Sequence, residues 1–239
     1  MVDTIHIDSR NVKMIAHRGL SGLERENTNA AFVAAGMRSY FGIETDIHRT
    51  ADGQFVVFHD DTTARLTELE WVVEEHTLAE LKTLVLKDKD ERFRSDLTLP
   101  TLDEYIRICK KYSKVAVLEL KNHMEPEVIQ KVIDMIRAEE YLEQTVFISF
   151  DLANMLCIRK TLPNQAAQYL VGKITDDLFD ILVENKLDLD ILHWELTAEF
   201  TARLHEAGRK VNVWTVDKPE HAQRVLEMGV DFITTNILE

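Results

Sequence analysis

The chain has 239 residues, and 28 lysines and arginines against 42 aspartates and glutamates give it a formal net charge of −14. With 45% hydrophobic residues and only four prolines, its composition is that of a globular protein with a large buried core. The acidic excess counts against nucleic acids and anionic membranes as partners, because both require a basic surface. No apolar stretch approaches the roughly 20 residues of a membrane-spanning helix, so we expect no stable membrane insertion.

The start of the chain carries Asp3 and Asp8 and no apolar stretch of signal-peptide length, which predicts a cytoplasmic protein. The two cysteines, Cys109 and Cys157, lie in helical, apolar patterns, and we interpret both as unpaired core thiols. The sequence leaves open whether the chain is a monomer or a homodimer.

Short runs rich in valine, isoleucine and phenylalanine alternate with helical segments along the chain, and their length and composition predict β-strands. The predicted strands are Val12–Arg18, Gly42–Ile47, Phe55–His59, Val115–Lys121, Thr145–Phe150, Ala167–Val171, Asp188–His193, Val211–Val216 and Asp231–Thr235. Such alternation is typical of a parallel sheet covered by helices, and eight units in about 250 residues correspond to a (β/α)8 barrel.

Nine strands are one too many for that barrel. The link between Ile47 and Phe55 is too short for a crossover helix, and it contains Asp52-Gly53, a pair typical of hairpin turns. We therefore expect a single domain, residues 1–239, folded as an α/β (β/α)8 TIM barrel that is distorted by one hairpin. A small helical insertion should follow the hairpin strand, at about 61–112. A doubly wound open sheet is the alternative, although no glycine-rich nucleotide-binding motif supports it.

Local signals predict where several helices begin and end. Capping-box threonines and first-turn prolines mark helix starts, and glycines after amphipathic stretches predict left-handed caps at helix ends. The residues concerned are Thr77, Thr101, Pro126, Pro219, Gly36, Gly208 and Gly229.

Carboxylates gather in two of the predicted strands. Glu44 and Asp46 are two residues apart, so their side chains point to the same side of one strand, and Glu119 ends another strand. In a barrel, the C-terminal ends of the strands form the catalytic face. Three carboxylates brought together there repel one another unless they are protonated or bind a cation. The pattern predicts one divalent cation, Mg²⁺ or Ca²⁺, as the cofactor.

Two histidines and two cationic side chains occur at the same strand ends. His17 and His59 can exchange protons near neutral pH, and they are candidates for a general acid/base pair. Arg18 and Lys121 concentrate positive charge in an otherwise acidic chain, and they are candidates to bind a phosphate. Together, these groups and the carboxylates predict metal-assisted hydrolysis of a phosphodiester.

Six short motifs occur in a fixed order between about Lys13 and Asn236. They are HRG (His17–Gly19), ENT (Glu26–Thr28), ETD (Glu44–Asp46), HD (His59–Asp60), LELK (Leu118–Lys121) and VWTVD (Val213–Asp217). Together they resemble the glycerophosphodiester phosphodiesterase family. The resemblance implies a (β/α)8 barrel that uses a divalent cation to hydrolyse a small-molecule glycerophosphodiester to an alcohol and glycerol 3-phosphate.

The resemblance also implies a role for each group. The three carboxylates would bind the metal, the two histidines would transfer protons, and Arg18 and Lys121 would hold the phosphate. Asn27 matches a family loop near the metal, where it would orient a ligand.

Two positions depart from the family pattern: Glu24-Arg25 precedes ENT where a proline is usual, and Asn236 stands where many members have aspartate followed by proline. We expect neither departure to touch the metal or the histidines.

Several further residues have both a functional and a structural interpretation. Trp214 either contacts the substrate or packs the barrel, and His48 and His193 either line the site or have structural contacts. Asp60 and Asp61 are interpreted as turn-forming residues.

Two other functions stay open. A lysophospholipase D or phospholipase-C-like activity on the same barrel would require an apolar entrance for acyl chains. A non-catalytic barrel that binds phosphorylated ligands should have lost a metal-binding carboxylate or a histidine, and here all five are present.

Overall fold

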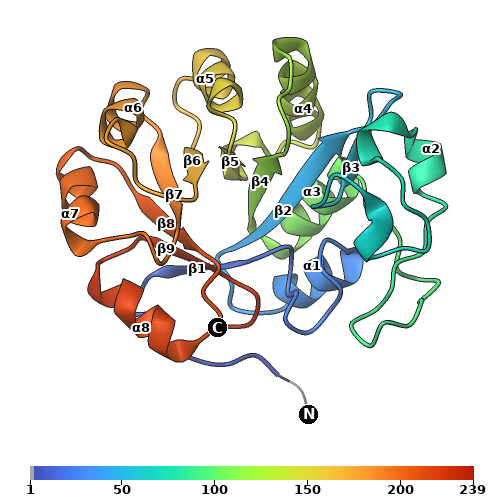
Figure 1. Ribbon diagram of the computed structural model, residues 1–239, viewed down its shortest axis with the longest axis horizontal. Coiled ribbons are helices and arrows are strands. Elements are labelled where there is room, and N and C mark those ends of the chain that lie inside the picture. Colours follow the sequence, from blue (N-terminus) through green and yellow to red (C-terminus); the bar gives the residue numbers. More distant parts are fainter. Residues whose placement is uncertain (1–2) are drawn as a thin grey trace.

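The computed structural model describes residues 3–239, which form a β-barrel surrounded by helices (Figure 1). The strands are β1 (Lys13–Ala16), β2 (Gly42–Arg49), β3 (Phe55–Val57), β4 (Val115–Leu120), β5 (Thr145–Ser149), β6 (Ala167–Val171), β7 (Asp188–Leu192), β8 (Val211–Trp214) and β9 (Phe232–Thr235). All nine predicted strands are confirmed.

The sheet closes on itself. Its order is β1-β9-β8-β7-β6-β5-β4-β2-β3, and β1 also pairs with β2, so eight parallel strands form a ring. The alternative of an open doubly wound sheet is therefore wrong. The one predicted strand outside the ring, β3, pairs antiparallel with the end of β2, which confirms the predicted hairpin.

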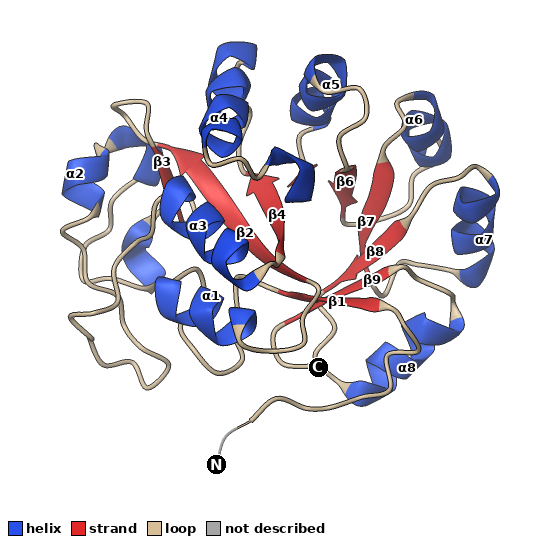
Figure 2. Cartoon of the chain, turned by 180° about the vertical axis from the view of Figure 1, so that it is seen from behind, coloured by secondary structure: helices blue, strands red, loops and turns tan. Residues whose placement is uncertain are grey.

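Helices lie outside the ring, as the view from behind shows (Figure 2). They are α1 (Asn29–Gly36), α2 (Leu78–Leu81), α3 (Leu102–Tyr112), α4 (Pro126–Ala138), α5 (Leu152–Thr161), α6 (Leu178–Glu184), α7 (Ala198–Glu206) and α8 (Pro219–Glu227), with 3₁₀ turns at Thr63–Arg65, Val73–Glu75 and Leu142–Gln144. Their buried faces and the outward faces of the strands form the main apolar core. None of the helices in residues 3–239 combines the length and apolar character that a membrane crossing requires.

The predicted helix signals hold with one exception. Capping boxes, first-turn prolines and glycines with positive φ occur at Thr77, Thr101, Pro126, Pro219, Gly208 and Gly229. Gly36 is not a left-handed cap, because it is the last residue of α1. A Cβ atom at Gly36 would lie 2.5 Å from Cδ2 of Tyr112 in α3, so the close approach of the two helices requires glycine there.

The stretch expected to be a helical insertion, 61–112, has two parts. Residues 61–101 contain two 3₁₀ turns and the short α2, and they pack on β3 around a separate apolar cluster that includes Phe58, Leu81 and Leu99. In contrast, α3 joins the main core through Leu102 and Ile106, and it connects β3 to β4 as one of the barrel helices.

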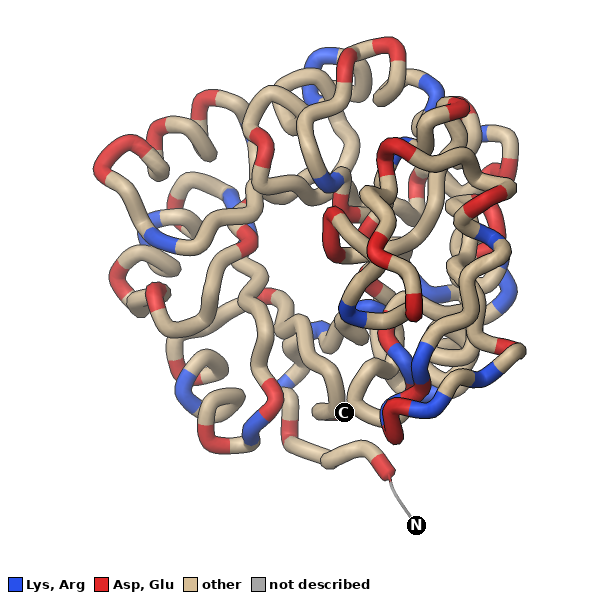
Figure 3. The backbone as a smooth tube through the Cα atoms, turned by 45° about the vertical axis from the view of Figure 1, so that its right-hand side comes forward, with Lys and Arg blue, Asp and Glu red and all other residues tan. Residues whose placement is uncertain are grey.

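Inside the ring, side chains alternate with those that face the helices. An apolar layer of Ile15, Val117, Ile148, Leu170 and Phe232 fills the interior. Polar side chains lie toward the C-terminal ends of the strands, and this arrangement places the site there. Charged residues are interspersed over the outer helices and loops (Figure 3). Both cysteines are unpaired, as predicted.

Candidate active site

The three predicted carboxylates lie together on adjacent strands. Asp46 of β2 is the direct register partner of Glu119 of β4, and Glu44 precedes Asp46 on the same face. One carboxylate oxygen from each residue lies within 4.8 Å of the others. All three are buried: Glu44 is 3% exposed, Asp46 is 1% exposed and Glu119 is 7% exposed. This is the one group of three or more acidic, histidine or cysteine ligands found within residues 3–239.

Burial and mutual repulsion divide the charge unevenly over this cluster. Burial raises the pKa of Glu119 to about 8, and it raises the pKa of Glu44 well above its usual range, with the Asp46 charge adding to both. Burial opposes ionisation of Asp46 too, but Arg18 and Lys121 lower the pKa of this carboxyl to about 2. Without a cation, protons on two of the carboxyls limit the repulsion.

The donor set fits a hard divalent cation. All three side chains offer oxygen, the residues are buried, and two of the carboxyls hold protons that a cation would displace. Cysteine and histidine ligands, which zinc prefers, are not part of the group.

His17 directly follows β1, and its ring is oriented by a residue after β9. Nδ1 lies 2.8 Å from Oδ1 of Asn236, whose amide nitrogen donates to Asp217 at 2.6 Å. Nδ1 of His17 therefore donates, and Nε2 is left unprotonated, 4.0 Å from Oε2 of Glu44. Burial, with a contribution from Arg18, lowers the pKa of His17 to about 4. The expectation that position 236 does not touch the histidines is wrong, because barrel closure brings the end of β9 beside β1.

A chain of ion pairs orients His59, which follows β3. Nδ1 of His59 lies 2.7 Å from Oδ1 of Asp60, and Arg65 donates to the other Asp60 oxygen at 2.6 Å. Arg65 also donates to both oxygens of Glu26, which accepts a further bond from Arg18 at 2.8 Å. Asp60 is thus more than a turn-forming residue. The adjacent HD pair in the sequence was the available signal for its contact with His59.

The HRG and ENT motifs shape the backbone beside the carboxylates. The backbone N–H of Arg18 donates to Glu44 at 2.7 Å. The side chain of Asn27 donates to Asp46 at 2.8 Å and accepts from Thr45 at 2.7 Å, so it fixes the orientation of the Asp46 carboxylate. Gly19 has φ 77°, and a Cβ atom there would lie 2.7 Å from Ala31, so glycine is required at the end of the HRG motif.

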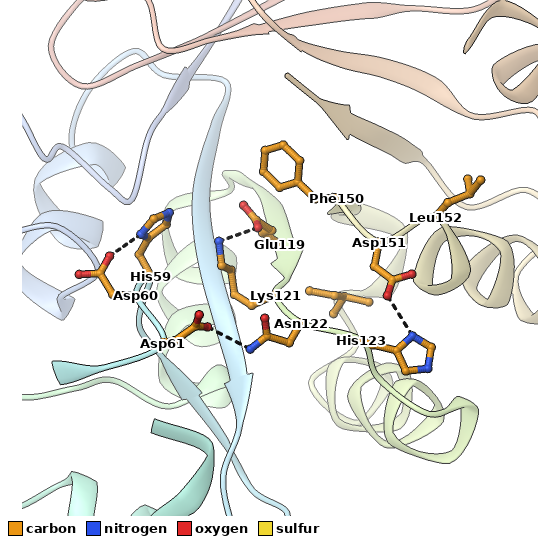
Figure 4. A pocket seen from close by; sticks show the side chains of 11 residues that line it. His59, Asp60, Asp61, Glu119, Lys121, Asn122, His123, Phe150, Asp151 and Leu152 are labelled. Atoms are coloured by element: carbon orange, nitrogen blue, oxygen red, sulfur yellow. Dashed lines mark hydrogen bonds and ion pairs between the residues drawn. The ribbon is translucent and has the colours of Figure 1, made fainter. Parts of the chain in front are cut away.

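Two cavities meet at the candidate site. A partly enclosed cavity of about 370 Å³ reaches into the barrel and is lined by both histidines, Glu44 and Trp214. An open groove of about 850 Å³ runs outward over the ends of β4 and β5. His59, Glu119 and Phe150 line both. Figure 4 shows the groove, with His59 bonded to Asp60 and Lys121 directed to Glu119, at 2.9 Å.

The remaining candidate residues differ in whether they line these two cavities. Trp214 faces the enclosed cavity, and its ring meets Phe150 edge-on at a centroid distance of 5.7 Å. His48 is buried and bonded to Glu74 at 3.0 Å, so it ties the hairpin to residues 61–101. His193 lies 3.1 Å from Arg224 and does not line either cavity. Asp61 accepts a bond from Asn122 on the groove wall.

Sequence reasoning missed Asp190 of β7. Its side chain lines the enclosed cavity and is 2% exposed. The alternation of side chains along the predicted strand was the signal that places it inside the barrel.

Residues 17–239 match the model of a family described as the Glycerophosphoryl diester phosphodiesterase family. The chain belongs to this family. It is therefore an enzyme of the glycerophosphoryl diester phosphodiesterase class, and the resemblance of its motifs is confirmed.

Relatives of this family are similar over nearly their whole length. A glycerophosphodiester phosphodiesterase of Caldanaerobacter subterraneus subsp. tengcongensis is 31% identical over 228 residues, which cover 93% of each chain. One from Bacillus altitudinis is 27% identical over 233 residues, or 94% of each chain. A solved structure of an Oleispira antarctica phosphodiesterase, in complex with the product sn-glycerol-3-phosphate, has a TM-score of 0.86 at 27% identity. The match covers 95% of the present chain and 94% of the Oleispira chain.

Proposed function

We propose that the chain hydrolyses glycerophosphodiesters to an alcohol and glycerol 3-phosphate, with one divalent cation, Mg²⁺ or Ca²⁺, held by Glu44, Asp46 and Glu119. The observation that carries this proposal is the convergence of three buried carboxylates within 4.8 Å of one another. Family membership and the glycerol-3-phosphate complex of the Oleispira phosphodiesterase support the choice of substrate.

A bound divalent cation would supply positive charge to the phosphate and lower the pKa of an attacking hydroxyl. Two side chains of the protein add to that charge. Nε of Arg18 is buried and has no hydrogen-bond partner among residues 3–239, although it lies 3.5 Å from Asp46. Nζ of Lys121 lies between Asp46 and Glu119, at 3.6 and 2.9 Å. We assign phosphate binding to these two cations.

His17 is assigned as the general base. Its contact with Asn236 leaves Nε2 unprotonated on the side of Glu44, and its lowered pKa keeps the ring neutral at physiological pH. Nε2 would take the proton of the attacking oxygen. That oxygen belongs either to the secondary hydroxyl of the glycerol half, which gives a cyclic phosphate that water then opens to glycerol 3-phosphate, or directly to water. Trapping the cyclic product in a single turnover of a slow variant supports the first route, and its absence supports direct attack by water.

His59 is assigned as the general acid for the departing alcohol. It lines the open groove, through which a head group of variable size can leave. Nδ1 of His59 faces the Asp60 carboxylate, so Nε2 is the nitrogen available to donate a proton. Burial lowers the pKa of His59, while the charge of Asp46 and the bond to Asp60 counteract this effect.

The groove favours small polar head groups over acyl chains. Its walls include Asp60, Asp61, Asp151 and His123, beside Leu120, the exposed Phe150 and Leu152. This lining does not resemble the apolar entrance that a lysophospholipase D or a phospholipase-C-like enzyme requires. A non-catalytic barrel is disfavoured by the joint presence of all three carboxylates and both oriented histidines.

The test is an activity panel with titrated Mg²⁺ and Ca²⁺, in which glycerophosphocholine, glycerophosphoethanolamine and lysophosphatidylcholine are compared. We expect turnover of the two glycerophosphodiesters, its loss on chelation, and much slower turnover of the lysophospholipid. Background turnover of every diester at saturating metal would contradict the proposal and favour the binding barrel.

A further inference from the structure

The enclosed cavity contains two buried polar atoms that the proposed proton transfers do not use. Oδ1 of Asp190 and Nε1 of Trp214 belong to residues that line the cavity, and neither atom has a hydrogen-bond partner within residues 3–239. Buried polar atoms are nearly always paired, and an unpaired one is costly unless a ligand or water meets it. Asp190 is 2% exposed, so its unpaired oxygen requires a hydrogen-bond partner inside the cavity.

Strand order places both atoms across the barrel from the carboxylates. Asp190 is in β7 and Trp214 ends β8, whereas Glu44 and Glu119 are in β2 and β4. In the closed ring, β7 lies opposite β2 and β8 lies opposite β4. The apolar side chain of Leu170, next to Asp190 in register, also lines the cavity. The cavity thus has a carboxylate wall, a wall with two unpaired polar atoms, and an apolar surface between them.

A hydroxyl matches the hydrogen-bonding character of both unpaired atoms. A hydroxyl accepts a hydrogen bond from an indole N–H and donates one to a carboxyl oxygen. Burial raises the pKa of Asp190 well above its usual range, with the Glu119 charge adding to it, so the wall adds little negative charge to repel a phosphodiester.

A glycerophosphodiester carries two hydroxyls on its glycerol half, one on the central carbon and one at the end. The central hydroxyl is adjacent to the phosphate-bearing carbon, so it stays near the carboxylate wall when the phosphate is bound between Arg18 and Lys121. The terminal hydroxyl extends further. We propose that Asp190 and Trp214 bind the terminal hydroxyl of the glycerol half and so select substrates in which this hydroxyl is free. This inference rests on the proposed function, and it names the part of the substrate that the protein recognises.

Acylation of the terminal oxygen would remove the hydrogen that Asp190 accepts and would add a chain to an enclosed cavity of about 370 Å³. Asp190 and Trp214 therefore disfavour binding of lysophospholipids, whose terminal oxygen is esterified. A site built to pair with a hydroxyl rejects analogues that lack it, because its own polar atoms are then left unpaired.

Two choline phosphodiesters test the proposal. One is sn-glycero-3-phosphocholine, and the other is the choline phosphodiester of propane-1,2-diol, which lacks only the terminal hydroxyl. We expect the wild-type chain to prefer the first by about 10- to 100-fold in kcat/KM. Calorimetry with sn-glycerol 3-phosphate and propane-1,2-diol 1-phosphate gives a second readout that needs no turnover, and we expect the same order of preference in Kd.

Variants assign the preference to the two residues. Asp190→Leu keeps the approximate size and removes the polar atoms, so the preference should fall to about threefold or less, because kcat/KM falls more for sn-glycero-3-phosphocholine than for the propanediol substrate. Asp190→Asn should keep more of the preference, and Trp214→Phe should lose part of it. Leu170→Val is the matched control, because it alters the same cavity without removing a polar atom, and it should keep the wild-type ratio.

The outcomes separate this inference from the proposed function. Equal use of both diesters by the wild-type chain overturns the inference and leaves the proposed function intact. An Asp190→Leu variant that slows both diesters equally also overturns it, since that result assigns Asp190 to barrel stability. If neither diester is hydrolysed at any metal concentration, the proposed function fails, and the calorimetric preference still decides the inference.

Discussion

Nδ1 of His17 lies 2.8 Å from the side-chain oxygen of Asn236, and this single contact determines which ring nitrogen faces the carboxylate cluster. The two residues are separated by almost the whole chain and meet because β1 pairs with β9. The partner is a neutral amide, so it orients the ring without adding negative charge beside it. Burial and the nearby Arg18 keep His17 unprotonated, although the bond to Asn236 itself favours the protonated ring.

The substitution Asn236→Asp tests this relationship. A carboxylate beside Nδ1–H should raise the pKa of His17 from about 4 by about 1–2 units, because it stabilises the imidazolium. A general base must be neutral, so activity is lost as the pH falls through the pKa of His17. The acidic limb of the kcat/KM profile should therefore move to higher pH. An unchanged acidic limb, with the fold intact, would argue against His17 as the base.

Metal binding should release protons. Burial raises the pKa of Glu119 to about 8 and also raises the pKa of Glu44, so both carboxyls favour the protonated form more strongly than they would in water. A cation requires the carboxylates, and its affinity should rise as the pH increases toward 8, by about tenfold per pH unit for each proton released. Calorimetry in buffers of different ionisation enthalpy measures this release. Glu119→Gln should bind more weakly and release fewer protons. A binding enthalpy independent of the buffer would contradict the assignment.

The two classes of site residue should separate in a binding assay. Glu44→Ala removes a ligand and should abolish tight metal binding together with turnover. His17→Ala should bind the metal normally and lose turnover by about 10²- to 10⁴-fold, the usual contribution of general base catalysis. Normal turnover in either variant would refute the role assigned to that residue.

The contact between α1 and α3 predicts an effect on stability. Gly36→Ala places a Cβ atom 2.5 Å from Tyr112, and we expect it to lower the free energy of unfolding by about 1–3 kcal/mol. Gly172→Ala is the matched control, since a Cβ atom at Gly172 meets nothing within 4 Å. Thermal unfolding should show a Tm lower by about 2–4 °C per kcal/mol for the first variant and little change for the second. Equal Tm values would mean that the helices separate without strain.

Most of the fold was predictable from local patterns. Strand composition and the short link at Asp52-Gly53 predicted the nine strands and the hairpin, since both signals lie within a few neighbouring residues. The i, i+2 spacing of Glu44 and Asp46 predicted that both carboxylates face one way. The position of α3 was harder to predict, because its sequence alone does not reveal that it packs on the barrel.

What could not be predicted depends on closure of the ring. Asn236 reaches His17, and Arg65 reaches Glu26, only because distant segments are folded against each other. Strand alternation places Asp190 inside the barrel, but no motif around it in the sequence marks it as part of the site. Its importance follows from an unpaired oxygen inside a cavity, which only coordinates reveal.

The carboxylates and His59 are carried by strands that are held in the sheet in different ways. Glu44 and Asp46 belong to the part of β2 that pairs with β4 in the ring, whereas His59 follows β3, which is held in the sheet by β2 alone. Residues 61–101 pack on β3 around an apolar cluster of their own, and they contact the ring at the end of β2, where His48 is bonded to Glu74. A shift of this outer segment would therefore displace His59 relative to the carboxylates, while the spacing between the oxygens of Asp46 and Glu119 would stay fixed by the pairing of β2 with β4.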